Sequence, residues 1–504
     1  MKNFLIVILI IGGALQFSSA QSGKAQLPEF QLEKSDIEAQ LRFIASDELM
    51  GRRTGSIGNN IAARFIAAEL EALGYRSPEG ADDYFQKINF AASRPPREGS
   101  LRLGDKDFAL GEDLILLDGE KKTVKAPAVY AEYGWIDEAA GRNDYADLDV
   151  KGKVVIILSG LPDSNDPSEV FAAMSTKRKL AADRGAVALI EVYTLSYPWT
   201  FFRNYFSRER IEPSAGENKD GLIYAWIQVT DRSDIEALKN GKSLSVELES
   251  GNGTYKSMAS QNVIGVLEGT DPKLKEEYIL LTAHYDHVGT GRQGGGAFGP
   301  QDSIFNGARD NGIGVVAILG AAKALAKQRP KRSVIILAVT AEEIGLLGSQ
   351  YYAAHPLIPL EKTIFNLNSD GAGYTNTEAA GIIGWDRTGT NKSVEQGLAA
   401  FGLEVIPEPA REQGLFDRSD NVSFAREGVP CLTFSPGFET FNQELMKNYH
   451  QVTDEADTVD FDYVQKFVQA FAHTARLIAD ADKRPVWVAG DKYEAAGKAL
   501  YEKK

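Results

Sequence analysis

The chain has 504 residues, of which 43% are hydrophobic and 25% are charged, and these proportions are typical of a folded globular protein. Its formal net charge of −15 argues against nucleic acid or an anionic membrane as a partner, since both require a basic surface. The length exceeds what one hydrophobic core normally supports, so we expect two domains.

The first twenty residues predict a signal peptide. Lys2 precedes an apolar run from Phe4 to Leu15, and the small residues Ser18-Ser19-Ala20 follow it. The run is shorter than the ~20 residues that a membrane-spanning helix needs, although an uncleaved anchor is the alternative interpretation. We therefore expect an exported protein, periplasmic or extracellular, with no membrane insertion once residues 1–20 are removed.

Three stretches with different secondary-structure patterns follow. Helical patterns occupy residues 35–73, with the glycine-punctuated loop Gly51–Ser56 between them. Short strand patterns dominate from about residue 97 to residue 256. From Asn262 onward strands and helices alternate regularly, up to a last helix over 461–479, and such alternation predicts a mostly parallel sheet flanked by helices.

We therefore expect an α/β domain built from residues 21–96 and 257–504, the mixed but mostly parallel sheet being covered by helices. Residues 97–256 would form an inserted, strand-rich α+β domain. The alternative is that this block forms one edge of a single large sheet.

Two local features within these stretches have more than one interpretation. The segment from Tyr197 to Phe206 is unusually aromatic, which is typical of a core or a surface patch and also compatible with a lid over a neighbouring cleft. The single cysteine, Cys431, lies in an apolar strand pattern. We expect it to be a small buried hydrophobic residue rather than a nucleophile.

Side chains that ligate metals recur where strand patterns end. Because the carboxyl ends of parallel strands meet at one edge of a sheet, these side chains should converge there. Without compensation such a cluster of carboxylates would be very costly, and Zn²⁺ suits mixed His, Asp and Glu donors. Five donors with one shared carboxylate suffice for two ions. The candidate positions, in chain order, are His284, Asp286, Asp310, Glu342, Glu343, Asp370 and His450.

The ordered set of motifs resembles that of peptidase family M28, and in particular its di-zinc aminopeptidases. The resemblance extends over roughly residues 35–95 and 257–480. The inserted block is similar to a protease-associated (PA) domain, on the basis of Asp144-Tyr145, the run from Asp149 to Val155, and Lys177. The motifs of the catalytic part are His284-Tyr285-Asp286, Asp310-Asn311-Gly312, the run Glu342-Glu343-Ile344-Gly345-Leu346-Leu347-Gly348-Ser349, Ser369-Asp370-Gly371 and Tyr449-His450.

The resemblance implies how two zinc ions are held. His284 and Asp370 would bind one ion, whereas Glu343 and His450 would bind the other. Asp310 would bridge the two.

The resemblance also implies roles for three residues around the metals. Glu342 would be the general base that takes a proton from the attacking water and returns it to the leaving amine. Asp286 would fix the tautomer of His284 by accepting a hydrogen bond from its other ring nitrogen. Tyr449 would donate a hydrogen bond to the developing oxyanion.

Other ionisable residues have no place in this pattern. His287 and His355 are expected to be ordinary polar residues, so that His287 would be replaceable with both metals retained. His473 should pack in the last helix. Asp420 either lines the pocket or shapes a loop.

The leading hypothesis is an exported aminopeptidase that removes N-terminal residues from peptides. A carboxypeptidase or dipeptidase with the same metal centre is an alternative, and a glutaminyl cyclase with a single zinc is another. A receptor-like ectodomain without activity is disfavoured because all five ligands and Glu342 are present. Five arginines are candidate clamps for a substrate carboxylate: Arg203, Arg208, Arg210, Arg411 and Arg418.

Overall fold

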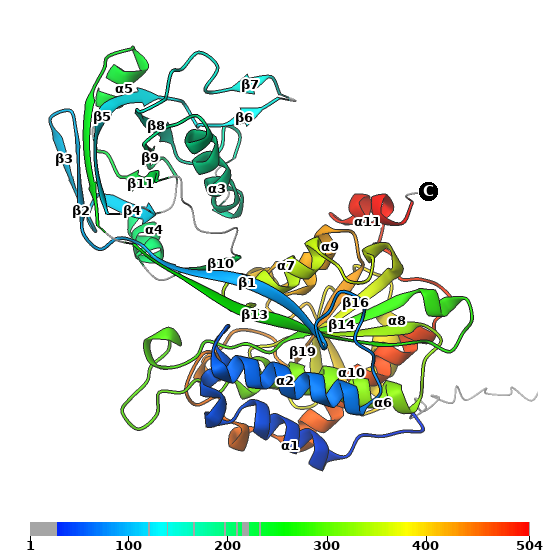
Figure 1. The fold of residues 1–504 in the computed structure, drawn as a ribbon. Coiled ribbons are helices and arrows are strands. Elements are labelled where there is room, and N and C mark those ends of the chain that lie inside the picture. The colour runs from blue at the N-terminus through cyan, green and yellow to red at the C-terminus, as the bar shows by residue number, and fades with distance from the viewer. Residues whose placement is uncertain are drawn as a thin grey trace, which may run out of the picture.

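The structure is a computed structural model that describes residues 28–502, except 119–120, 139, 165–166, 196–197, 208–209, 214–220, 231–232 and 252. The expected signal peptide therefore lies outside the described residues. Figure 1 shows two bodies, each built on a large sheet, which are connected by the long paired strands β1 (Phe85–Arg94) and β13 (Thr254–Leu267).

The first sheet has nine strands in the order β10-β1-β13-β15-β14-β16-β19-β17-β18. Its four central strands, β15, β14, β16 and β19, run parallel, whereas β13 and β17 flank them in antiparallel orientation. The α/β prediction is thus confirmed, and the parallel strands lie at the centre of the sheet. The strands not yet delimited are β10 (Arg210–Pro213), β14 (Tyr278–His284), β15 (Ser333–Val339), β16 (Thr363–Ser369), β17 (Ala379–Ile383), β18 (Glu404–Pro407) and β19 (Cys431–Pro436).

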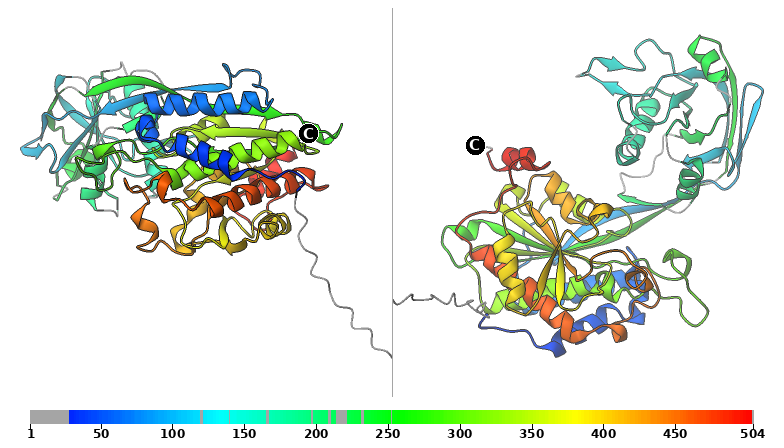
Figure 2. Two further views of the ribbon diagram at one scale, coloured as in Figure 1. Left: turned by 90° about the horizontal axis from the view of Figure 1, so that it is seen from below. Right: turned by 180° about the vertical axis from the view of Figure 1, so that it is seen from behind.

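Helices cover both faces of this sheet (Figures 1 and 2). Alternate residues of β14 point to opposite faces, so Leu281 packs against one helical layer and Leu280 against the other. The first layer contains α1 (Lys34–Ile44), α2 (Ile57–Ala72), α6 (Ile313–Lys327), α8 (Asn391–Ala399) and α10 (Phe461–Asp480). The second contains α7 (Leu347–Ala354), α9 (Asn421–Arg426) and α11 (Glu494–Tyr501).

The second sheet has eight strands in the order β3-β2-β12-β5-β8-β9-β11-β4 and packs around cores of its own. It draws all its strands from residues 99–250, but β10, from the same stretch, pairs with β1 in the first sheet. The strands are β2 (Gly99–Leu103), β3 (Lys106–Ala109), β4 (Leu114–Asp118), β5 (Lys122–Tyr130), β8 (Val154–Leu158), β9 (Ala188–Val192), β11 (Ile223–Ile227) and β12 (Ser245–Ser250). The short pair β6 (Ile136–Asp137) and β7 (Arg142–Asn143) and the helices α3 (Pro167–Asp183), α4 (Trp199–Phe206) and α5 (Ser233–Lys239) complete this body.

The aromatic segment forms α4 and contributes to the core of the second body. Trp199, Phe202 and Phe206 are buried, and Phe202 lies against the indole of Trp226 at a ring-centroid distance of 5.6 Å. Phe201 on the same helix remains 54% exposed. The core interpretation therefore accounts for three of the eight residues of the helix.

The strand ends place the candidate residues at one edge of the first sheet. β14 ends at His284 itself, β16 ends one residue before Asp370, and β15 ends three residues before Glu342. Every residue of β15 and β16 is buried, as expected for parallel strands covered on both faces. Among the described residues, no helix combines the length and apolarity needed to cross a membrane.

Candidate metal centre

The two carboxylate oxygens of Asp310 face two different groups of side chains. Its Oδ1 lies 3.4 Å from Nε2 of His284, and the same nitrogen lies 3.3 Å from Oδ1 of Asp370. Its Oδ2 lies 3.1 Å from Nε2 of His450, which is also 3.1 Å from Oε2 of Glu343. The structure thus brings together all five predicted ligands, as two groups of three donors that share one carboxylate.

Both groups fit a tetrahedral zinc ion. Zinc bonds of about 2.0–2.2 Å place neighbouring ligand atoms of a tetrahedron roughly 3.3–3.6 Å apart. The observed distances of 3.1–3.4 Å between donors are close to this spacing. Three protein donors per group leave a fourth position for water or substrate, which is the arrangement of catalytic zinc sites. The shared Asp310 makes the pair suitable for two ions.

The group that accepts a hydrogen bond from Nδ1 of His284 is not the predicted one. Its Nδ1 lies 3.2 Å from the main-chain carbonyl oxygen of Asp286, whereas the carboxylate of Asp286 is 3.9 Å away. A carbonyl only accepts, so Nδ1 carries the proton and Nε2 is free to face Asp310 and Asp370. The carboxylate of Asp286 is directed elsewhere: it accepts hydrogen bonds from the Glu342 amide at 3.1 Å and the Thr54 hydroxyl at 3.0 Å. The tautomer is therefore fixed by the backbone, and Asp286 instead anchors the loop of the proposed general base.

Glu342 sits beside the metal positions but is not one of the close donors. The turn that presents it contains Ala341 at a φ of +62°, a left-handed conformation that is uncommon outside glycine. Its Oε2 lies 3.9 Å from Nε2 of His284. Burial, together with the negative charges of Asp370 and Glu343, raises the pKa of Glu342 well above its ordinary value, despite the opposing effect of His284. A carboxylate with a raised pKa next to a metal site has the proton affinity that a general base requires.

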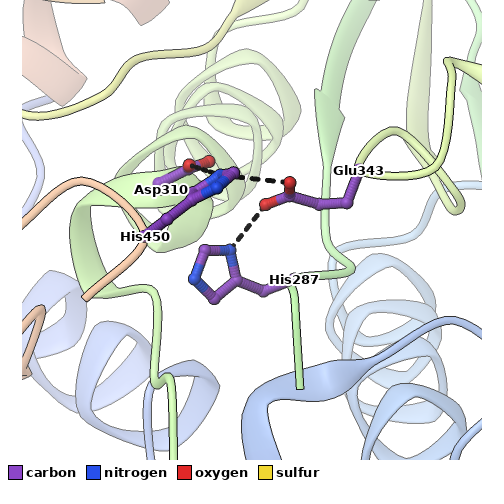
Figure 3. Close-up of side chains that lie close together, drawn as sticks. All are labelled: His287, Asp310, Glu343 and His450. Atoms are coloured by element: carbon purple, nitrogen blue, oxygen red, sulfur yellow. Dashed lines mark hydrogen bonds and ion pairs between the residues drawn. The ribbon is translucent and has the colours of Figure 1, made fainter. Parts of the chain in front are cut away.

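The second group of donors is highly charged (Figure 3). Burial and the neighbouring Asp310 act to raise the pKa of Glu343, but the contacts with His287 and His450 outweigh them and lower it to about 2. Burial acts to lower the pKa of His450, whereas its hydrogen bonds with Asp310 and Glu343 raise it to about 11. In the absence of a cation, a proton on His450 therefore partly compensates the carboxylates.

Figure 3 also shows a residue that sequence reasoning placed outside the site. His287 is buried, and its Nδ1 lies 2.7 Å from Oε1 of Glu343. Its ligand-type atoms lie within 4.8 Å of those of Asp310, Glu343 and His450. The expectation that His287 is unrelated to the site is therefore wrong. His355, by contrast, is exposed at the C-cap of α7, in agreement with the prediction.

Arg52 is a buried residue that supports the site and that the sequence did not reveal. Its side chain is completely buried, and its guanidinium donates hydrogen bonds to the carbonyl oxygens of Ile44, Tyr285, Asn306 and Gly307 at 2.5–3.1 Å. Burial lowers the pKa of Arg52 to about 10, although nearby carboxylates oppose this effect. Arg52 thus ties the loop after α1 to the loops that present His284 and Asp310.

Asp454 and Ser419 are two further residues that position ligands. The carboxylate of Asp454 accepts hydrogen bonds from the amides of Arg309 and Asp310, at 2.9 and 3.1 Å, and so connects the loop of His450 with that of Asp310. The hydroxyl of Ser419 donates to Oδ2 of Asp370, leaving Oδ1 directed toward His284. Neither residue belongs to a motif, so only the fold reveals these contacts.

Asp420, next to Ser419, is fully buried at the start of α9. Burial, opposed by His284 and reinforced by Asp370 and Asp286, raises its pKa to about 7. It does not line the cleft described below, which favours the interpretation that it shapes the loop.

The metal positions form the floor of an open cleft of about 560 Å³. Tyr449 lines it and stacks on the imidazole of His450, with ring centroids 4.3 Å apart. Arg418 is the only arginine or lysine among the lining residues, and Arg203, Arg210 and Arg411 do not reach it. Arg208 lies outside the described residues. The apolar wall of the cleft consists of Ala372, Ile383, Leu415, Phe438 and Phe441.

Removal of divalent cations is expected to destabilise the protein. A chelator would leave a proton on His450 as only a partial compensation for Asp310 and Glu343, whereas bound cations stabilise the folded state by mass action. We expect the melting temperature to fall by several degrees after dialysis against a chelator, as measured by differential scanning calorimetry, and to recover on addition of Zn²⁺. An unchanged melting temperature after the bound metal has been removed would contradict a metal centre at this position.

Comparisons with known proteins find a peptidase family and similar peptidases. The model of peptidase family M28 matches residues 262–475. Aminopeptidase YwaD of Bacillus subtilis is 25% identical over 424 residues, which cover 84% of this chain and 80% of that protein. The vacuolar membrane protease of Saccharomyces cerevisiae strain YJM789 is 40% identical over 161 residues, but these cover 32% of this chain and only 14% of the protease.

A solved structure shows the same fold. The aminopeptidase from Aneurinibacillus sp. strain AM-1 superposes with a TM-score of 0.53 at 20% sequence identity, and the match covers 91% of this chain and 97% of that one. The matched family is the one that the motifs resembled, so that prediction is confirmed. The assignment of residues 97–256 to a PA domain stays a prediction.

Proposed function

We propose that the protein is a di-zinc aminopeptidase that removes N-terminal residues from peptides, starting from the match of residues 262–475 to the model of peptidase family M28. The observation that carries the proposal is the division of five donors into two groups of three around the shared Asp310, with Glu342 beside them. The similarity to aminopeptidase YwaD over most of both chains supports the same reaction. A glutaminyl cyclase, which needs only one zinc, would leave the second group of donors without a role.

The residues of the cleft would have different roles in hydrolysis. Zinc held by these donors would lower the pKa of a water and polarise a carbonyl. Glu342 accepts the proton from the attacking water as the new C–O bond forms, and then returns it to the nitrogen of the leaving amine as the C–N bond breaks. Tyr449, on the wall of the cleft, donates a hydrogen bond to the carbonyl oxygen as negative charge develops on it.

The lining of the cleft offers little to bind a free carboxylate at the end of the substrate. Two bound zinc ions would offset the charge of the four carboxylates on the metal side, so Arg418 is the cation of the lining that is left to pair with a substrate carboxylate. Arg418 is exposed and directed toward Gln413, with its Nη1 3.5 Å from Oε1 of that residue. A carboxypeptidase would need a cation placed to form a charge-assisted pair with the substrate.

The apolar wall suggests the kind of N-terminal residue that is cleaved. Phe438 and Ile383 are buried at the cleft, and Phe441 and Leu415 are partly buried beside them. A large apolar side chain would bury its surface there, at roughly 25 cal/mol per Å² of apolar area. We therefore propose leucine or phenylalanine as the preferred N-terminal residue. We also infer export from the pattern over residues 1–20, which lie outside the described part of the chain.

Steady-state hydrolysis of paired substrates tests the function. We expect leucine p-nitroanilide to be cleaved with a kcat/KM at least tenfold above that of lysine p-nitroanilide. N-acetyl-leucine p-nitroanilide, which lacks the free amine, should not be cleaved. Release of C-terminal residues from N-blocked peptides, or preference for the blocked anilide, would contradict the aminopeptidase assignment and favour the carboxypeptidase alternative.

A further inference from the structure

We propose that His287 is a positioning residue for the second metal position: its Nδ1–H donates to Oε1 of Glu343 and thereby directs Oε2 of the same carboxylate toward His450 and Asp310. The proposal rests on the two-metal site proposed above. It adds a residue outside the five ligands and the general base.

The contacts distinguish His287 from a ligand. Nε2 of His450 lies 3.1 Å from both Oδ2 of Asp310 and Oε2 of Glu343, so these three atoms surround one point. Nδ1 of His287 makes its close contact, 2.7 Å, with the other oxygen of Glu343. Figure 3 shows the carboxylate of Glu343 between the two imidazoles, one at each oxygen. An ionised carboxylate only accepts hydrogen bonds, so the nitrogen of His287 that faces it is the donor.

The backbone around His287 holds the ring in this place. The His287 amide donates to the carbonyl of Arg52 at 3.3 Å, and Arg52 is itself anchored by its buried guanidinium. The ring packs directly on Gly307, where an added Cβ would lie 2.6 Å from Cδ2 of His287. Gly307 has a φ of +58°, and its carbonyl accepts one of the hydrogen bonds of Arg52. Packing against Gly307 and the hydrogen bond to the carbonyl of Arg52 therefore fix the orientation of the imidazole.

This arrangement has a consequence for metal affinity. A carboxylate can rotate about its last bond or offer both oxygens to one cation, and a hydrogen bond to one oxygen restricts this freedom. Loss of the partner that orients a ligand typically lowers metal affinity by about 10–100-fold. The ring of His287 is hydrogen-bonded to Glu343 and lies edge-on to His450, with ring centroids 5.5 Å apart. Both residues belong to the second group, so the effect should be confined to one of the two ions.

Zinc binding to purified full-length variants tests the proposal without reference to activity. Metal-free wild type, His287→Ala, His287→Phe and His287→Asn would be titrated with Zn²⁺ in competition with a chromophoric chelator. Phenylalanine keeps the ring volume but removes the donor, and asparagine places an amide N–H at the position of Nδ1. We expect the weaker-bound zinc to lose about 10–100-fold in affinity in the alanine and phenylalanine variants. The asparagine variant should stay within about threefold of the wild type.

The controls separate the possible failures. His355→Ala, which removes an exposed histidine, should bind two zinc ions as the wild type does. Melting temperatures of the metal-free variants establish that each is folded before titration. A phenylalanine variant with wild-type affinity for both ions would overturn the proposed role, as would an asparagine variant as impaired as the alanine one, because that result identifies a direct ligand. A wild type that binds fewer than two zinc ions would instead overturn the two-metal proposal itself.

Discussion

Glu342→Gln should reduce kcat for leucine p-nitroanilide by about 10²–10⁴-fold while the fold and two zinc ions are retained. Glutamine keeps the size of the side chain and its position on the turn after Ala341, but its amide cannot accept the proton of the attacking water. The loss should appear in kcat and in kcat/KM equally, because the interaction removed is made only in the transition state. Kinetics and metal analysis on the same preparation measure both quantities.

Two matched variants make this result interpretable. Glu343→Gln changes the adjacent residue, which contacts His450 at 3.1 Å, and it should lose one zinc ion as well as activity. Glu276→Gln, on the surface, should be indistinguishable from the wild type. Retained activity in Glu342→Gln, or loss of zinc from it, would assign Glu342 a role other than general base.

Arg52→Met should lower the free energy of unfolding by about 3–5 kcal/mol. The substitution leaves the buried carbonyl oxygens of Ile44, Tyr285, Asn306 and Gly307 without their donor, and each unsatisfied buried group costs about 1–3 kcal/mol before the structure relaxes. Methionine fills the space of the aliphatic stem, so the loss reports mainly on the hydrogen bonds. Urea denaturation of the metal-free protein measures the change without a contribution from bound zinc.

Arg64→Met is the appropriate control, because Arg64 pairs with Asp83 at the surface, where both side chains are more than half exposed. Exposed pairs contribute up to about 1 kcal/mol, so this variant should remain close to the wild type. Equal effects of the two substitutions would show that the buried guanidinium does not hold the site loops together.

The sequence predicts best where the period of the pattern is unambiguous. The helix predicted over 461–479 agrees with α10 to within a residue, because a helical apolar stripe has few alternatives. The pattern around residue 262 did not indicate that β13 begins at Thr254 and runs on into the second body. Its outer part is polar and short-range patterns do not reveal which strands pair.

The candidate site was predictable wherever a ligand type follows a strand. His284, Asp310 and Asp370 stand in such places, and the resemblance to family M28 connects them with Glu343 and His450. The residues that support the ligands were not predictable in this way. Arg52 and Asp454 form hydrogen bonds with main-chain atoms of loops that are far away in the sequence, and no sequence pattern indicates such contacts. The carboxylate of Asp286 was assigned to His284 because the two are neighbours, but the turn directs it to Thr54 and Glu342. Proximity in sequence therefore gave the wrong partner for this carboxylate, because tertiary contacts determine which groups it binds.

The spread of the ligands along the chain affects when the enzyme becomes active. His284 and His450 are separated by more than 150 residues, so no short peptide from this protein gathers both halves of the centre, and closing so long a loop is entropically costly without the sheet. During synthesis the second group of donors stays incomplete until residue 450 has emerged. The complete two-metal centre therefore forms only in the folded domain.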